Sequence, residues 1–239
     1  MKITLINPNT SRAMTAKIAA AALDVAGPGI EIAAVCPEEG PAAIESHTDE
    51  AFAAVAIIRL VEQDLRAGGS DAYVIACFGD PGLDAARELV DVPVIGIAEA
   101  AMHIASISGR SFGVVTTLSR TLGRAQDLVE RYGMTRACVS MAASGIPVLD
   151  LEDSAEDDVD QIALLCAEAV RDRGADVVVL GCAGMADLCA ELAARIGVPV
   201  VDGVAAAVGI AAAMGRMGVG TSKRDEYAFP PARTASDAR

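Results

Sequence analysis

Two stretches of this chain share one pattern and stand about a hundred residues apart. Residues 71–79 and 176–184 each begin with aspartate, continue as an apolar run typical of a buried strand, and end in cysteine, one further residue and glycine. Cys77 and Cys182 both stand six residues after the aspartate. Each stretch then leads through a helix-like segment to the tripeptide Val-Pro-Val. A repeated strand that carries a cysteine at its carboxyl end is the feature that a fold and a function must explain.

Short β-rich runs alternate with longer helix-like segments along the whole chain. Strands are expected at residues 3–6, 30–35, 72–76, 94–97, 111–115, 137–140 and 177–180. Helices are expected at residues 14–25, 48–66, 83–89, 99–106, 159–173 and 204–217, with a further one ending at residue 132. Strands that alternate with helices of this length predict parallel sheets covered by helices on both faces.

The spacing of two landmarks indicates an internal duplication. Cys182 follows Cys77 by 105 residues, and the pair Ser119-Arg120 follows Ser11-Arg12 by 108. The two offsets agree within a short insertion, and the period is longer than that of solenoid repeats. We therefore predict an α/β fold of two similar lobes, each a parallel sheet flanked by helices, related by a pseudo-twofold duplication.

The duplication also predicts how the chain is divided. We expect residues 1–97 and 205–222 to form the first lobe, residues 98–204 the second lobe, and residues 223–239 a polar C-terminal tail. The last helix would then cross back from the second lobe onto the first.

Composition and charge exclude several classes of function. The formal charge is −14, from 19 basic and 33 acidic residues, and no basic stripe suited to nucleic acid is visible. Trp is absent and aromatic residues make up 3%, so the core must be built from Ala, Val, Leu and Ile. The apolar run at the N-terminus is too short for a signal peptide, and no stretch is a convincing membrane span. Six cysteines without a Cys-x-x-Cys pair indicate free thiols in a reducing compartment, so we expect a cytoplasmic protein.

The position of the two cysteines indicates a shared site. Ligands bind at the carboxyl ends of parallel strands, and Cys77 and Cys182 are expected there on opposite walls of one cleft. The glycines that follow, Gly79, Gly82 and Gly184, allow a close approach of the backbone. We also expect each cysteine to precede a helix start, whose N–H groups would favour a thiolate or bind an oxyanion.

Two opposed thiols suit racemisation of a carbon acid. One thiolate removes a proton from one face of the carbon, the carbanion is delocalised as an enolate, and the other thiol returns a proton to the opposite face. A single cysteine at a strand end is usually a core residue, but two at equivalent positions of a duplication favour function. We assign the other four cysteines, at positions 36, 138, 166 and 189, to structure.

Other motifs carry less chemistry. His47 and His103 are the only histidines, and with unspaced cysteines they form no recognisable zinc set, so no metal site is expected. No glycine-rich nucleotide loop follows a strand. Asp80, beside the first cysteine, would either cap a helix or contact substrate.

Four segments resemble the Asp/Glu/hydantoin racemase superfamily and, within it, the hydantoin and allantoin racemases. They are residues 6–11 (Ile-Asn-Pro-Asn-Thr-Ser), 40–42 (Gly-Pro-Ala), 77–83 (Cys-Phe-Gly-Asp-Pro-Gly-Leu) and 181–185 (Gly-Cys-Ala-Gly-Met). The resemblance covers nearly the whole chain, and the two cysteine segments are its specific part. It implies a racemase that needs no cofactor, a cleft between two α/β lobes, a small-molecule substrate and a homo-oligomer.

The resemblance also implies which residues form the site. Cys77 and Cys182 match the pair of cysteine acid/bases. The substrate-binding positions that match the cleft loops are Asn7, Ser11, Phe78, Gly79, Asp80, Thr116, Thr117, Ala183, Gly184 and Met185.

One departure bears on the substrate. In amino-acid racemases of this superfamily Asn-Thr follows the cysteines, whereas here Phe78-Gly79 and Ala183-Gly184 follow them. Exposed backbone amides suit a neutral, planar ring, which favours C5 of a 5-monosubstituted hydantoin, with allantoin among the candidates. The alternatives are an aspartate or glutamate racemase, a maleate-type cis–trans isomerase, and a non-catalytic two-lobed binding module.

Overall fold

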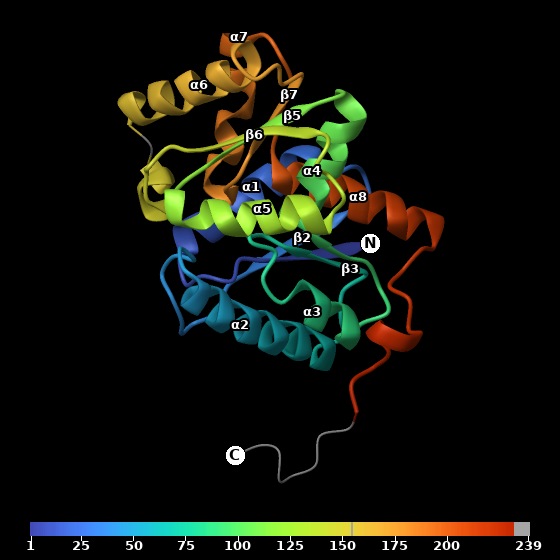
Figure 1. Cartoon of the computed structure of the whole chain (residues 1–239). Helices are drawn as coiled ribbons and strands as arrows, with labels where there is room; N and C mark the ends of the chain where they lie inside the picture. Colours follow the sequence, from blue (N-terminus) through green and yellow to red (C-terminus); the bar gives the residue numbers. More distant parts are fainter. Residues whose placement is uncertain (154, 232–239) are drawn as a thin grey trace.

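Two four-stranded parallel sheets form the framework of the protein (Figure 1). In this computed structural model, residues 1–153 and 155–231 are described. The first sheet has the order β2-β1-β3-β4 and consists of β1 (Lys2–Ile6), β2 (Glu31–Val35), β3 (Ala72–Ile75) and β4 (Val94–Gly96). The second has the order β6-β5-β7-β8 and consists of β5 (Phe112–Thr116), β6 (Cys138–Ala143), β7 (Val177–Leu180) and β8 (Val200–Val201). The predicted fold class, two similar lobes with parallel sheets, is confirmed.

The repeated strand of the sequence occupies the same place in both lobes. In the first sheet β3 pairs with β1 and β4, and in the second sheet β7 pairs with β5 and β8. The two strands also begin and end 105 residues apart, at 72 and 75 against 177 and 180, which is the spacing of the cysteines. Each cysteine therefore lies two residues beyond an inner strand of its sheet.

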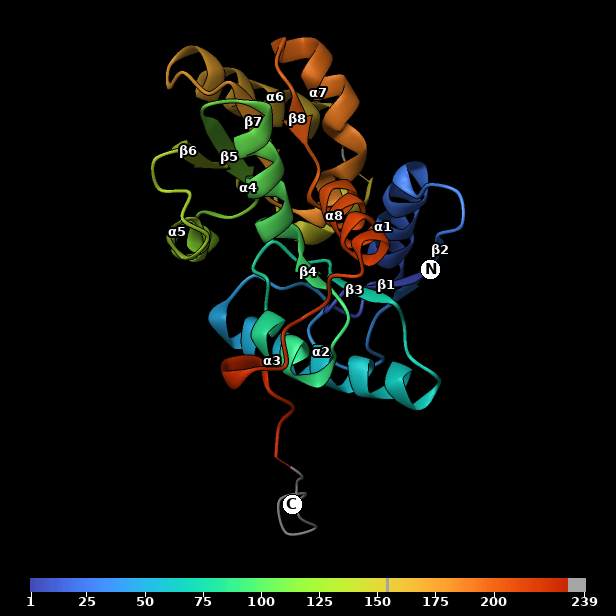
Figure 2. The ribbon, with the colours of Figure 1, turned by 90° about the vertical axis from the view of Figure 1, so that its right-hand side faces the viewer.

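Helices cover both faces of each sheet. They are α1 (Arg12–Val25), α2 (His47–Arg66), α3 (Leu83–Leu89), α4 (Ile97–Ser108), α5 (Leu122–Arg131), α6 (Glu156–Arg171), α7 (Cys189–Ile196) and α8 (Gly203–Met217). In Figure 1, α2 and α3 lie on the outer face of the first sheet, and α6 and α7 lie on the outer face of the second. Figure 2 shows α1, α4 and α8 between the two sheets.

The helix that follows the last strand of each sheet packs on the other sheet. Helix α8 contacts β3, β4 and α1 of the first lobe, and α4 contacts β7 and β5 of the second. The two helices also pack against each other at the centre of the molecule (Figure 2). The predicted division into residues 1–97 with 205–222 and residues 98–204 stays a prediction, which these contacts support.

The alternation of side chains along each strand explains how a strand contributes to two core layers. Ile3 and Leu5 point into a central core together with Val177 and Val179 of the other sheet. Ile6, one position along, points into the outer core under α2 and α3. Successive side chains of a strand face opposite sides, so a continuous apolar run serves both layers. The core is dominated by Ala, Val, Leu and Ile, as the composition requires.

Serine caps define where two of the helices begin. Ser11 accepts a hydrogen bond of 3.0 Å from the backbone N–H of Met14, and Ser46 accepts one of 3.2 Å from that of Asp49. These bonds satisfy N–H groups that have no partner within the helix. None of the described helices is both long enough and apolar enough to cross a membrane.

The segment after α8 is anchored on the first lobe. The Thr221 hydroxyl donates a hydrogen bond to the Val92 carbonyl, next to β4. Two residues further on, Lys223 donates to the carbonyl oxygens of Arg87 and Glu88, at 2.5 and 3.1 Å. A short 3-10 helix, η4 (Asp225–Tyr227), packs on α3. The predicted tail of residues 223–239 therefore begins with an ordered strap, and residues 232–239 lie outside the described part.

Candidate active site

One cavity lies at the carboxyl ends of the inner strands of both sheets. Cys77, after β3, and Cys182, after β7, both line it. The negative charge of an ionised Cys182 raises the pKa of Cys77, because the two thiols are close enough to interact. The residues that line the cavity are Asn7, Pro8, Asn9, Met14, Ile44, Glu50, Ala76, Cys77, Phe78, Gly79, Thr116, Thr117, Thr121, Arg124, Ala125, Val148, Gly181, Cys182, Ala183 and Gly184.

Each thiol receives the backbone N–H of the glycine two residues further on. The Gly184 N–H donates to the Cys182 sulfur at 3.4 Å, and the Gly79 N–H forms the corresponding bond to Cys77. A donor to the sulfur favours the thiolate, so both bonds lower the pKa of the thiol. The Cys-x-Gly repeat of the sequence thus has the same local role in both lobes.

The expected helix start after each cysteine is found only once. The 3-10 helix η3 (Ala183–Leu188) begins directly after Cys182. After Cys77 the chain makes a turn first, and α3 begins six residues later, at Leu83. The expectation for Cys77 is therefore wrong, because the turn through Asp80 separates the cysteine from the helix.

Burial favours the protonated form of both thiols. Burial and the charges of Cys182, Asp80 and Glu50 together raise the pKa of Cys77 to about 12, although the Gly79 bond lowers it. Burial likewise raises the pKa of Cys182 to about 11. Lys17 lowers the pKa of Cys182, so the two half-buried thiols differ in their charged neighbours.

Lys17 reaches the second cysteine loop from the other lobe. It lies on α1, and its Nζ donates to the carbonyl oxygens of Leu151 at 2.7 Å and Gly184 at 3.1 Å. It also forms an ion pair of 3.1 Å with Asp187. The cation is therefore held beside the loop that carries Cys182, and it joins the two lobes there.

Seven of the predicted substrate-binding residues line the cavity. They are Asn7, Phe78, Gly79, Thr116, Thr117, Ala183 and Gly184. Two of their side chains already have partners in the protein. The Asn7 amide donates to Asn9 at 2.7 Å and Thr15 at 3.0 Å, and the Thr116 hydroxyl donates to the Gly181 carbonyl at 3.0 Å. These hydrogen bonds hold the loops that follow β1 and β5, and the contact of both side chains with substrate stays a prediction.

Three other predicted residues are not among those that line the cavity. Ser11 caps α1 and donates its hydroxyl to Glu152 of the second lobe. Met185 is fully buried in the outer core of the second lobe. Asp80 is buried beneath the Cys77 loop. Each lies within a motif that also contains lining residues, but the local turn directs its side chain into the protein.

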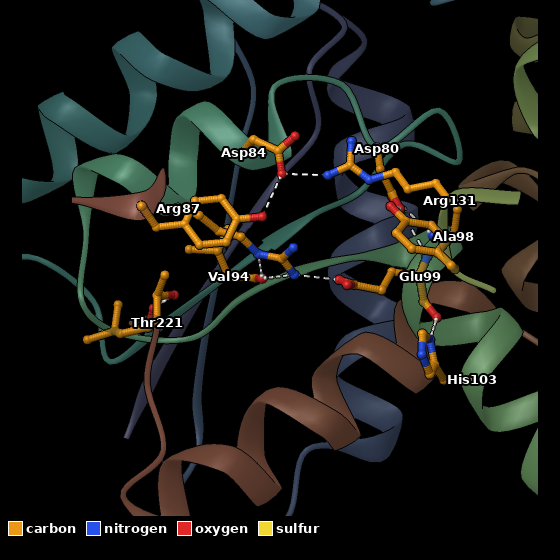
Figure 3. A network of polar contacts seen from close by, with 12 residues as sticks. Asp80, Asp84, Arg87, Val94, Ala98, Glu99, His103, Arg131 and Thr221 are labelled. Carbon is orange, nitrogen blue, oxygen red and sulfur yellow. Dashed lines mark hydrogen bonds and ion pairs between the residues drawn. The ribbon is translucent and has the colours of Figure 1, made fainter. Parts of the chain in front are cut away.

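Asp80 connects the first cysteine loop to the second lobe (Figure 3). Its carboxylate accepts hydrogen bonds from the backbone N–H groups of Ala98 at 3.1 Å and Glu99 at 2.9 Å, in the first turn of α4. A third bond, of 2.7 Å, comes from the hydroxyl of Tyr132, after α5. Burial nevertheless raises the pKa of Asp80 to about 7. Of the two roles left open by the sequence, the structure shows the capping role.

A polar network surrounds this cap. Arg87 donates to the Val94 carbonyl at 3.0 Å and to the Glu99 carboxylate at 2.6 Å. Asp84 accepts from Arg131 at 2.5 Å and from Tyr227 at 2.9 Å (Figure 3). These contacts connect α3, α4, α5 and the C-terminal strap around the outside of the Cys77 loop.

Two charged residues of the cavity could not be predicted from the sequence. Glu50 lies on α2 and Arg124 on α5, in different lobes. Arg124 donates through Nε and Nη2 to the Gly79 carbonyl, at 3.1 and 2.8 Å, and its Nε lies 3.5 Å from a Glu50 oxygen. Neither residue stands near a cysteine motif, and each belongs to an ordinary amphipathic helix, so no spacing pointed to them.

The fold and the cavity define an α/β protein of two duplicated lobes that each present one thiol to a common site. The family model described as Asp/Glu/hydantoin racemase matches residues 3–211, and the chain belongs to this family.

Relatives match over nearly the full chain. The hydantoin racemase of Rhizobium meliloti is 45% identical, with 99% of this chain and 98% of the relative covered. That of Paenarthrobacter aurescens is 41% identical, with 96% and 98% covered. The structure of allantoin racemase from Klebsiella pneumoniae superposes with a TM-score of 0.95 at 47% identity, over 98% of this chain and 95% of that one.

Proposed function

We propose that the protein racemises 5-monosubstituted hydantoins at C5, with allantoin among the candidate substrates. The observation that carries the proposal is the presence of Cys77 and Cys182 in one cavity, each bonded to a glycine N–H two residues on. Relatives of 41% and 45% identity are hydantoin racemases, and an allantoin racemase shares the fold at 47% identity. These names support the ring substrate over an amino acid.

In the proposed reaction one cysteine acts as base and the other as acid. The thiolate takes the C5 proton, and the electrons of the broken C–H bond move onto the adjacent carbonyl as an enolate. The opposite thiol then gives its proton to the other face of C5 and becomes the thiolate. Atoms and charge balance, no oxidant or cofactor is required, and the next turnover can run in reverse.

The high pKa of both thiols has a direct consequence for this scheme. With values of about 12 and 11, few molecules carry a thiolate at neutral pH. The active form holds one thiolate and one thiol, and the two protons titrate as properties of the pair. Activity should therefore rise with pH above neutrality.

The experiment is solvent-deuterium exchange at C5 of each enantiomer. The unaltered protein should invert allantoin or hydantoins with benzyl, isobutyl or methyl substituents, and should incorporate deuterium as it does so. Cys77→Ser and Cys182→Ser should each lower racemisation by about 10²- to 10⁴-fold, the usual contribution of a general acid or base. Cys36→Ser is the control, because Cys36 is also half-buried but does not line this cavity. Near-normal racemisation by both cysteine variants would show that the two-thiol mechanism is wrong.

Cellular setting and assembly belong to the same proposal. All six cysteines are free, which favours a reducing compartment, and we place the protein in the cytoplasm. Homo-oligomerisation is implied by the family resemblance and is tested by the mass of the protein in solution.

A further inference from the structure

The cavity contains a matched pair of opposite charges. Among the described residues that line it, Glu50 and Arg124 are the charged ones. The Arg124 Nε lies 3.5 Å from a Glu50 oxygen, and the two side chains are 27% and 22% exposed. The formal charge of the cavity wall is therefore zero when the thiols are protonated.

The cation of this pair already has partners. Two of its nitrogen atoms, Nε and Nη2, donate to the Gly79 carbonyl, and Nε also faces Glu50. The Glu50 carboxylate lies against the backbone beside the first thiol, because a Cβ on Gly79 would meet its Oε1 at 2.8 Å. An anionic group that sought Arg124 would have to compete with this carboxylate at close range.

We propose that Glu50 is the specificity-determining residue that keeps the cavity selective for neutral rings, by neutralising Arg124 and repelling carboxylates. This inference rests on the proposed racemisation of hydantoins and adds the basis for its choice of substrate. Selectivity of this kind requires a repulsive group against the wrong ligand as well as a fit for the right one. At separations of a few ångströms in a partly buried site, one charge changes the relative affinity for an anion by about tenfold or more.

The test compares two substrates of the same shape and different charge. They are hydantoins that carry a 2-carbamoylethyl group or a 2-carboxyethyl group at C5. The measured quantity is the ratio of kcat/KM for the acid to kcat/KM for the amide. Both substrates use the same thiols, so a change in the acidity of Cys77 cancels from the ratio.

Four variants separate charge from structure. Glu50→Gln keeps the shape and removes the charge, and it should raise the ratio by about tenfold or more. Glu50→Asp keeps the charge and should leave the ratio near that of the unaltered protein. Glu62→Gln removes a charge from the same helix outside the cavity and should also leave it unchanged. In the double variant Glu50→Gln with Arg124→Gln, the gain should be smaller, because the repulsion by Glu50 is removed but no free cation is left to attract the acid.

The outcomes distinguish this inference from the proposed function. If the unaltered protein racemises neither substrate, the proposed function fails. If it racemises the amide and Glu50→Gln leaves the ratio unchanged, the function stands and the role of Glu50 is refuted. A gain of undiminished size in the double variant refutes the neutralisation of Arg124 by Glu50. If Glu50→Gln does not fold, Glu50→Ala, assayed for competitive inhibition by the acid against the amide, gives the same comparison.

Discussion

The hydroxyl of Tyr132 donates a 2.7 Å hydrogen bond to the buried carboxylate of Asp80, across the boundary between the two lobes. The bond joins the loop that carries one proposed catalytic thiol to the helix layer of the opposite lobe. The geometry of the cavity therefore depends on a contact that lies outside it.

Removing this hydroxyl should destabilise the fold. Tyr132→Phe keeps the ring beside His103 and Arg131 but deletes one of three donors to a buried carboxylate. We expect a loss of about 1.5–3 kcal/mol in the free energy of unfolding, measured by urea denaturation. Tyr227→Phe is the matched control, because it deletes a bond to Asp84, whose side chain is 45% exposed, and should have the smaller effect. Equal losses would show that burial of the acceptor is not what matters.

The pH dependence of stability should reveal the state of Asp80. Its pKa is about 7 when folded, against 3.8 for an unperturbed carboxyl, so the folded state binds more protons between those values. The contribution of Asp80 to stability is therefore present at low pH and is lost as pH rises through that window. The difference in unfolding free energy between the unaltered protein and Asp80→Asn should fall from pH 4.5 to pH 7.5. A difference that rises with pH would mean that the three hydrogen bonds outweigh burial.

Lys17 should control the reactivity of one thiol and not the other. Its charge lowers the pKa of Cys182, whereas Cys77 has Glu50 and Asp80 as charged neighbours. Lys17→Gln should slow alkylation of Cys182 by iodoacetamide about threefold or more, since the thiolate is the reacting form. Site-resolved mass spectrometry should show Cys77 unaffected.

The control for this prediction is Lys2→Gln. Lys2 also forms a partly buried ion pair, with Asp64 at 2.8 Å, but it lies at the other end of β1 from the cavity. Equal slowing at both cysteines in Lys17→Gln would contradict the prediction, whereas faster alkylation of both would point to a general loss of structure.

Two glycines should respond in opposite directions to the same substitution. A Cβ on Gly96 would lie 2.3 Å from the carboxyl carbon of Asp80, so Gly96→Ala must displace the cap and should cost about 1–3 kcal/mol. Gly209 is exposed in the middle of α8 and has nothing within 4 Å of its Cβ position, so Gly209→Ala should stabilise by about 0.5–1 kcal/mol. Thermal unfolding with a racemisation assay should show that only Gly96→Ala also loses activity.

The repeated sequence predicted the framework because its signals are local. Strands β3 and β7 were recognised by buried apolar runs with a fixed offset, and the cysteines inherit their positions from those strands. Short 3-10 segments such as η2 (Val148–Asp153) were missed, since a turn of that length leaves no periodicity. Most of the predicted site was therefore inferred from the carboxyl ends of the predicted strands.

The rest of the cavity arises from packing between distant elements. Glu50 and Arg124 meet only because α2 and α5 lie against opposite sides of the cavity, and nothing in the helical pattern of either distinguishes these positions. Asp80 and Met185 stand next to lining residues in the chain but point inward, because a turn or a 3-10 helix rotates successive side chains to different sides. Adjacency in a motif predicts proximity to the site without predicting direction.

The exchange of α4 and α8 between the lobes sets an order for biosynthesis. The first sheet is complete at Gly96, but α8, which covers part of its inner face, leaves the ribosome more than a hundred residues later. Until then α1 already packs on the inner face of this sheet, but β3 and β4 lack the cover that α8 provides, so their inner face is open to wrong partners or to chaperones. A ribosome stalled before residue 203 should therefore hold a first lobe that is readily cleaved by proteases, and only release of the full chain should protect both halves together.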